Sequence, residues 1–174
     1  ALVRWNHPRR GLVSPGVFVP VAEELGVIHR LGAFVLERAC TDLVRWRRDL
    51  PEEAAEMSIA VNLSAQELHS NALVETVKAV LESSGLGAES LVLEVTESNL
   101  LQDSESILSR MRELRDLGAR LAIDDFGTGY SSLGYIQRFD FDILKIDRSF
   151  VEGLDHGTNV QIVTAVIEMA SQLG

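Results

Sequence analysis

The chain has 174 residues, of which 46% are hydrophobic and 24% charged, a composition typical of a globular domain with one sizeable core. Its formal net charge of −10 argues against a nucleic-acid polymer as partner, because such phosphate backbones are bound by Lys and Arg. Cys40 is the single cysteine, which excludes an intrachain disulfide and a cysteine-clustered zinc site, and its thiol is interpreted as a small core group. A membrane span needs about 20 apolar residues, and no apolar run is that long, which predicts a soluble protein.

The N-terminal third of the chain contains one strong helical pattern. Apolar residues recur at helical spacing within residues 25–51, which predicts a long amphipathic helix that Pro51 ends. The predicted stripe consists of Leu31, Phe34, Val35, Ala39, Leu43 and Trp46. Trp46 is interpreted as a core residue rather than a cofactor contact.

From residue 58 onward, short β-type runs alternate with longer segments of helical period. The predicted strands cover residues 58–64, 91–98, 119–127 and 142–150. The predicted helices follow at residues 65–85, 103–118, 131–139 and 158–174, with capping boxes of Ser64 with Glu67 and of Thr158 with Gln161. Strands this apolar need cover on both faces of a parallel sheet. The pattern therefore favours a doubly wound sheet or a (β/α) barrel.

Polar side chains follow the apolar part of every predicted strand. They are Asn62, then Glu94 and Glu97, then Asp124 and Asp125, and finally Lys145 and Asp147. Each has an ordinary structural explanation when taken alone, since Asn or Asp often caps the next helix and a lysine can extend to solvent. Together they indicate a site, because the carboxyl ends of successive parallel strands meet at one rim, where (β/α) barrels carry out their chemistry.

This rim is rich in oxygen ligands and has no associated Cys or His, a set that suits Mg²⁺ or Mn²⁺ rather than zinc. The adjacent Asp124 and Asp125 offer ligands for two ions, with one carboxylate bridging both. Two ions suit in-line displacement at phosphorus, and they would let an acidic protein hold an anionic substrate. Lys145 would add a fixed cation near the attacking water. The same rim also fits an enolase-like barrel, in which carboxylates hold Mg²⁺ and a lysine abstracts a proton.

At these residues the sequence resembles the EAL domain family, bacterial phosphodiesterases that hydrolyse cyclic di-GMP. The start ALVRW, residues 1–5, is similar to the end of the Glu-Ala-Leu-x-Arg-Trp signature of that family, and His7 and Pro8 follow it. The segments VNLS, LEVTES, DDFGTGYSSL and LKIDRSFV match in order and spacing. The resemblance covers the whole chain. It implies a TIM-like (β/α) barrel that opens cyclic di-GMP to linear pGpG in bacterial second-messenger signalling.

The resemblance also implies roles for individual side chains. The implied metal ligands are Asn62, Glu94 and Asp124 for one ion, and Asp125 and Asp147 for a second. Lys145, near the attacking water, and Asp125 are the implied catalytic residues, and Arg4 looks like the phosphate-contacting arginine of the family. Glu97 resembles the glutamate that holds the loop at residues 126–133, a loop implicated in metal binding and dimerisation.

The family pattern extends past both ends of this chain, which starts without Met and within an apolar run. The Glu of the signature, itself a metal ligand, would precede Ala1, and strands with an Ala-Glu-Gly-Val-Glu motif and a later Gln would follow Gly174. A TIM barrel takes about 250 residues, so residues 1–174 are predicted to be a partial EAL domain and an incomplete barrel. By itself this piece is expected to show little hydrolysis and to expose a sheet edge that favours association.

The resemblance further implies a homodimer, a parent protein with fused sensor or GGDEF domains, and a cytoplasmic location, with the parent either free or anchored to the inner membrane. Some family members have lost catalysis and act as cyclic di-GMP-binding or protein-interaction modules. Such domains commonly lose rim ligands, and every rim ligand expected within residues 1–174 is present. This favours the enzyme over the binding module.

Overall fold

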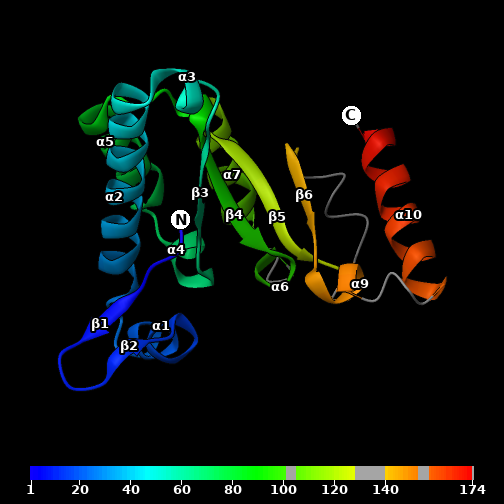
Figure 1. Ribbon diagram of the computed structural model, residues 1–174, viewed down its shortest axis with the longest axis horizontal. Coiled ribbons are helices and arrows are strands. Elements are labelled where there is room, and N and C mark those ends of the chain that lie inside the picture. Colours follow the sequence, from blue (N-terminus) through cyan, green and yellow to red (C-terminus); the bar gives the residue numbers. More distant parts are fainter. Residues whose placement is uncertain (101–104, 128–139, 153–156, 174) are drawn as a thin grey trace.

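The computed structural model describes residues 1–100, 105–127, 140–152 and 157–173 (Figure 1). Its N-terminal part consists of the hairpin β1 (Trp5–His7) and β2 (Gly11–Val13) and the helices α1 (Pro15–Glu24), α2 (Ile28–Asp49) and α3 (Pro51–Ala54). Four strands come next along the chain: β3 (Ile59–Asn62), β4 (Leu91–Thr96), β5 (Arg120–Phe126) and β6 (Ile143–Ile146). The helical segments described among and after them are α4 (Ala65–His69), α5 (Leu73–Ser84), η1 (Ala88–Ser90), α6 (Glu97–Leu100), α7 (Glu105–Asp116), α9 (Arg148–Glu152) and α10 (Gly157–Leu173).

The strands β3 to β6 form one parallel sheet in the order β3-β4-β5-β6. Spatial order follows chain order throughout, which is the arrangement of a (β/α) barrel, whereas a doubly wound sheet reverses its order at a switch point. Among the described strands, β3 and β6 have one neighbour each, so the barrel is incomplete, as predicted. The first residue lies beside β3, because the amino group of Ala1 donates a hydrogen bond to the Ala60 carbonyl.

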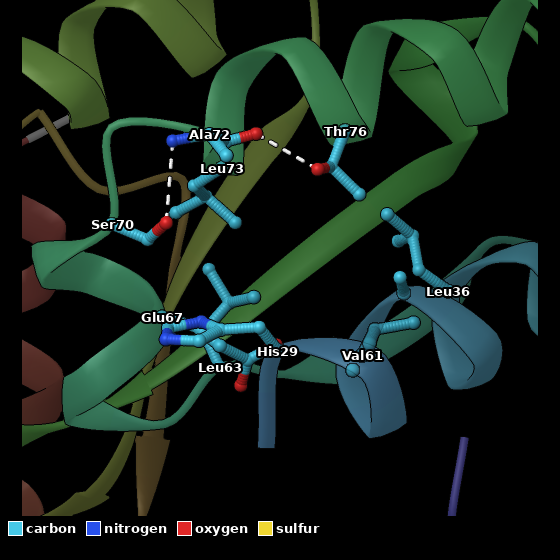
Figure 2. Close-up of a pocket in the computed structure, with 11 residues that line it drawn as sticks. His29, Leu36, Val61, Leu63, Glu67, Ser70, Ala72, Leu73 and Thr76 are labelled. Atoms are coloured by element: carbon cyan, nitrogen blue, oxygen red, sulfur yellow. Dashed lines mark hydrogen bonds between the residues drawn. The ribbon is translucent and has the colours of Figure 1, made fainter. Parts of the chain in front are cut away.

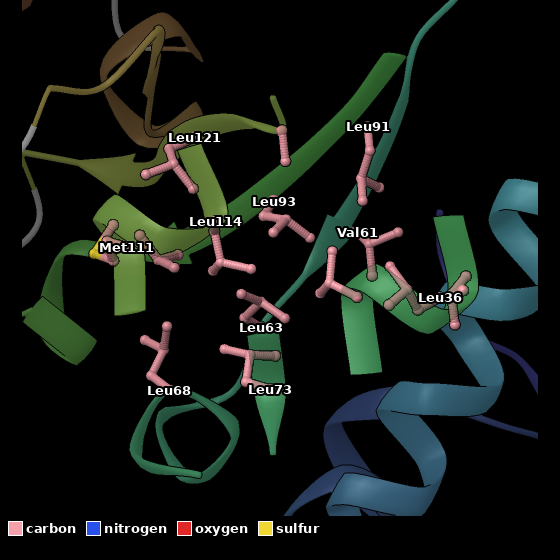
Figure 3. Close-up of a cluster of buried hydrophobic side chains, with 14 of the residues drawn as sticks. Leu36, Val61, Leu63, Leu68, Leu73, Leu91, Leu93, Met111, Leu114 and Leu121 are labelled. Carbon is pink, nitrogen blue, oxygen red and sulfur yellow. The ribbon is translucent and has the colours of Figure 1, made fainter. Parts of the chain in front are cut away.

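The core consists of side chains from β3, β4 and β5 and from the helices packed on them, chiefly α2, α5 and α7 (Figure 3). In β4, every residue from Leu91 to Val95 is buried, as expected of a strand covered on both faces. Cys40 of α2 is fully buried and belongs to this core, as predicted. Burial raises the pKa of its thiol to about 11, so it stays protonated and unreactive near neutral pH.

The predicted apolar stripes are correct where a helix faces the core and wrong where it does not. In α2, Ala39 and Leu43 are buried and Trp46 packs against the core, as predicted. Phe34 is 60% exposed, because this part of α2 faces an open cavity beside the first residues of the chain. In α10, helical spacing predicts a stripe of Val163, Val166, Ile167 and Ala170. Ile167 is nevertheless 55% exposed, since this helix lies at the β6 side of the sheet, where β6 itself is only half-buried (Figure 1).

The single helix predicted at residues 65–85 is two helices, α4 and α5. The break lies at Ser70, whose backbone is extended and whose hydroxyl accepts a hydrogen bond from the Ala72 amide at 3.2 Å. Arg110 of α7 stabilises the break, because its buried guanidinium donates to the Leu68 carbonyl at 2.6 Å and to the Asn71 side-chain oxygen. Local periodicity does not predict the break, because the partner that stabilises it comes from a distant helix.

The capping box predicted for Ser64 and Glu67 is confirmed at the start of α4. The helix predicted at residues 131–139 lies outside the described residues, and the capping box of Thr158 with Gln161 involves a side chain outside the described part. Among the helices of the described residues, none has both the length and the apolarity to cross a lipid bilayer.

We expect Arg110→Met to lower the free energy of unfolding by about 2–4 kcal/mol, because it leaves the Leu68 carbonyl and the Asn71 side chain without their buried donor. Arg112→Met is the matched control, since Arg112 is exposed on the same helix, and we expect it to change stability by no more than about 0.5 kcal/mol. Urea denaturation measures both. Equal losses in the two variants would contradict the role given to Arg110.

Candidate active site

The predicted rim residues lie at the carboxyl ends of four adjacent parallel strands. Asn62 ends β3 and is the register partner of Glu94 in β4. Asp124 in β5 is the register partner of Thr96, and Lys145 belongs to β6. The strand order therefore brings Asn62 and Lys145, which are 83 positions apart in the chain, to one end of the sheet.

Lys145 lies between two carboxylates at the centre of this rim. Its Nζ is 2.7 Å from Glu94 Oε1 and 2.9 Å from Asp124 Oδ1. Burial acts to lower the pKa of Lys145, but hydrogen bonds to Glu94 and Asp124 and the charges of both carboxylates outweigh it, so the pKa is raised. The positive charge that these two carboxylates need is thus supplied by a lysine from the neighbouring strand.

Asp125 and Asp147 form a second acidic pair beside the first cluster. Asp125 has a backbone φ of +54°, a conformation that Asp tolerates better than most residues. Burial and the charges of Asp124 and Asp147 raise the pKa of Asp125. Hydrogen bonds from the Ser149 side chain and amide lower the pKa of Asp147. One carboxyl group of the pair thus holds its proton more strongly than usual, and the other ionises more readily.

The donor set of the rim suits a hard divalent cation, although a complete cage is not assembled. Glu94 and Asp124 direct carboxylate oxygens to one point, the Nζ of Lys145, which shows that a cation fits between them. Across the part of the chain that the structure describes, no three His, Cys, Asp or Glu side chains gather closely enough to enclose a metal ion. The geometry therefore provides a two-carboxylate cation position.

Glu97 contacts the start of the loop that follows β5. Its Oε2 accepts a hydrogen bond from the Gly127 amide at 3.1 Å. Gly127 has φ +99°, and a Cβ there would lie 2.9 Å from Cε2 of the Phe150 ring, so this position requires glycine. Glu97 is also the first residue of α6, so it is placed both to anchor the loop and to stabilise the helix start. Residues 128–133 of the loop lie outside the described residues.

Arg4 lies on the segment before β1 and is exposed. Its Nη1 donates a hydrogen bond to the Val3 carbonyl at 2.9 Å, and it lines a cavity of about 330 Å³ between the first residues and α2. None of these described contacts is to Glu94, Asp124 or Lys145. The structure thus brings the acidic rim residues together with Lys145 and does not join Arg4 to them.

Sequence reasoning missed two residues of α9 that shape the rim, Ser149 and Phe150. Ser149 donates its amide to Asp147 Oδ1 at 2.9 Å, and its hydroxyl also donates to that oxygen. Phe150 packs its ring over Gly127. A serine two residues after an aspartate is a local signal for the first contact. No local signal predicts the second, because it joins segments 23 positions apart, 150 minus 127.

Comparison with known proteins identifies the family to which this chain belongs. A model of the EAL domain matches residues 1–174, so the chain belongs to the EAL domain family, as the resemblance predicted. The chain is 48% identical to an uncharacterized signaling protein of Caulobacter vibrioides, with 99% of this chain and 21% of that protein covered.

Two relatives from Pseudomonas aeruginosa carry functional names. The chain is 41% identical to the bifunctional diguanylate cyclase/cyclic di-GMP phosphodiesterase MucR, with 99% of this chain and 25% of MucR covered. It is 44% identical to the cyclic di-GMP phosphodiesterase NbdA, with 99% of this chain and 22% of NbdA covered. The chain thus spans about a fifth to a quarter of the length of these curated relatives.

Solved structures of EAL proteins have the same fold. The MucR phosphodiesterase in complex with cyclic di-GMP is 41% identical and superposes with a TM-score of 0.91, with 99% of this chain and 69% of that chain covered. The EAL enzyme Bd1971, with cAMP and cyclic di-GMP bound, is 29% identical with a TM-score of 0.92, covering 99% of this chain and 47% of that chain. The described sheet is therefore part of a TIM-like barrel.

Proposed function

We propose that the protein carrying this chain hydrolyses cyclic di-GMP to linear pGpG with divalent metal ions, in bacterial second-messenger signalling. The observation that carries the proposal is the cluster of Glu94, Lys145 and Asp124, in which three adjacent strands bring two carboxylates to one cation position. Membership in the EAL family supports it, as do the cyclic di-GMP phosphodiesterase activities that the names of MucR and NbdA state. The solved EAL structures with bound cyclic di-GMP support the same ligand.

A divalent cation is the general cofactor of EAL phosphodiesterases, and the rim fits one. In our proposal Glu94, Asp124 and Asn62 hold a first ion, because their strands are adjacent and their oxygens are the ligands that hard cations prefer. Asp125 and Asp147 serve a second ion. Bound Mg²⁺ or Mn²⁺ would supply Lewis acidity toward the phosphate and lower the pKa of a bound water.

The side chains of the rim have separate tasks in this proposal. Lys145, which contacts Glu94 and Asp124 in the metal-free protein, gives up this position to the ion and orients the attacking water. Asp125, which lies beside Asp124 and Asp147 at this rim, is the second proposed catalytic residue, and its carboxylate oxygens are available to the second ion and to the attacking water. Arg4, whose guanidinium is exposed, contacts a phosphate of the substrate.

The proposal includes the assembly and location of the parent protein. We infer a homodimer in the cytoplasm and a parent with fused sensor or GGDEF domains, anchored to the inner membrane or free. The length of the relatives supports further domains, since the chain covers 25% of MucR, whose name includes a diguanylate cyclase activity as well. Sedimentation of the full-length protein tests the dimer.

We expect Glu97→Ala to raise the Mg²⁺ concentration needed for half-maximal activity about tenfold and to weaken dimerisation, because the loop that begins at Gly127 loses its anchor. A Mg²⁺ titration of activity and light scattering of the same sample measure the two effects. Glu105→Ala, an exposed change in the first turn of α7, is the control. A loss of thermal stability with neither effect would show that Glu97 serves only to stabilise the start of α6.

The function itself is tested by incubating the full-length protein with cyclic di-GMP and Mg²⁺ or Mn²⁺ and separating the products by chromatography. We expect pGpG, and we expect EDTA to abolish its formation. Binding of cyclic di-GMP without hydrolysis would instead assign the chain to the non-enzymatic members of the family. An absence of both would contradict the proposed ligand.

A further inference from the structure

The turn that follows Asn62 is fixed by hydrogen bonds on two sides. On one side, the Leu63 amide donates to the Glu94 carbonyl at 2.8 Å, which extends the β3–β4 ladder beyond Asn62. On the other side, Glu67 Oε2 accepts from the Ser64 amide at 3.0 Å and from the Ser64 hydroxyl at 2.7 Å. The backbone directly after Asn62 is therefore held both by the neighbouring strand and by a carboxylate of α4.

The carboxylate of Glu67 is enclosed between α4 and α2. Glu67 is 7% exposed, and a Cβ placed on Gly32 of α2 would lie only 1.7 Å from Glu67 Oε1 and 2.7 Å from its Cδ. Glycine at position 32 is what allows α2 to approach this carboxylate so closely. His29, in the preceding turn of α2, lies beside Glu67 and Leu63 (Figure 2).

We propose that Glu67 is a positioning residue for Asn62 and that it couples the position of α2 to the acidic rim. The contacts run from Gly32 through the Glu67 carboxylate to the Ser64 amide, two residues from Asn62. Removing a side chain that orients a metal ligand without touching the ion typically lowers the metal affinity by about 10- to 100-fold. The inference rests on the proposed function, in which Asn62 is a metal ligand.

In the full-length protein, Glu67→Ala should raise the Mn²⁺ concentration for half-maximal hydrolysis about tenfold, while kcat at saturating Mn²⁺ stays close to that of the wild type. Glu67→Gln should have the half-maximal Mn²⁺ concentration of the wild type, because its side-chain amide oxygen can still accept both hydrogen bonds from Ser64. Gly32→Ala should act like Glu67→Ala, since the new Cβ displaces the carboxylate. In a Glu67→Ala background, Gly32→Ala should then add nothing.

Val77→Ala is the control for a purely structural effect. Val77 is fully buried in α5, and its truncation lowers stability without removing a hydrogen bond of the turn after Asn62. It should lower the melting temperature at least as much as Glu67→Ala while leaving the half-maximal Mn²⁺ concentration unchanged. Equal Mn²⁺ shifts in the two variants would overturn the positioning role.

Hydrogen exchange separates this inference from the proposed function. In Glu67→Ala, the amides of residues 62–64 should exchange at least about tenfold faster than in the wild type, with exchange in β5 unchanged, because local opening follows the loss of local hydrogen bonds. Unchanged exchange at residues 62–64 overturns the positioning role whether or not the protein is active. A wild-type protein that does not hydrolyse cyclic di-GMP contradicts the proposed function, and the exchange result still decides the role of Glu67.

Discussion

Glu94→Gln should reduce the rate of cyclic di-GMP hydrolysis by the full-length protein about 1,000-fold while leaving the fold intact. Glu94 is buried at 7% exposure and supplies one of the two oxygens that converge on the cation position at the rim. An amide keeps the shape but removes the charge that holds a divalent ion. Loss of several kcal/mol of metal stabilisation corresponds to about a thousandfold in rate, because about 1.4 kcal/mol is a factor of ten.

Glu89→Gln is the matched control for this substitution. Glu89 is exposed in η1, next to the opposite end of β4, so the same change in charge occurs away from the rim. Its activity should remain within about twofold of the wild type, the range expected when a surface change alters stability by no more than about 0.5 kcal/mol. Steady-state kinetics with circular dichroism on both variants makes the comparison. A Glu94→Gln protein with a near wild-type rate would contradict the site.

Lys145→Met should lower the melting temperature of the metal-free protein and make that temperature more sensitive to added Mn²⁺. Without the ammonium, Glu94 and Asp124 are left as neighbouring carboxylates with no cation between them. We expect a decrease of about 2–4 °C, a small shift because the Lys145 side chain is 40% exposed and its ion pairs are screened by water. Activity should fall at least about 100-fold, as expected when a charged group that stabilises the transition state is removed.

The difference in melting temperature between the wild type and Lys145→Met should depend on pH in a definite direction. The pKa of Lys145 is raised above its usual value of 10.5 by Glu94 and Asp124, against the opposing effect of burial. Its stabilising contribution is therefore complete below pH 10.5 and is lost as the pH rises through the pKa of the folded state. The gap in melting temperature between wild type and Lys145→Met should narrow above pH 10.5. Differential scanning calorimetry measures this, with the exposed Lys78→Met of α5 as control. A gap that widens with pH would contradict the ion pairs.

The parallel sheet and its rim could be predicted from the sequence because both depend on local signals. An apolar run that ends in a polar residue marks the carboxyl end of a strand, and four such runs place Asn62, Glu94, Asp124 and Lys145 at one end of the sheet. The short helix after Asn62 also has a local signal, the Ser64 and Glu67 capping box.

The features that could not be predicted depend on partners that are distant in the chain. The break between α4 and α5 is stabilised by Arg110, which comes from α7. The contact of Lys145 with Glu94 requires strand pairing and side-chain direction, not spacing alone. Phe34 has the right spacing for a core residue, yet it is exposed because no described element covers that part of α2. The helical spacing of apolar residues therefore shows which side chains share a face of a helix, but it does not show whether another element packs against that face.

The central claim, that Glu94 and Asp124 hold a catalytic divalent ion where Lys145 now lies, is tested most directly by anomalous diffraction. Crystals of the full-length protein grown with Mn²⁺ should show an anomalous peak bonded to carboxylate oxygens of both residues at about 2.1 to 2.2 Å, with Lys145 Nζ moved from between them. A crystal grown at saturating Mn²⁺ in which Lys145 keeps its contacts with both carboxylates, and in which the rim shows no anomalous peak, would contradict the account.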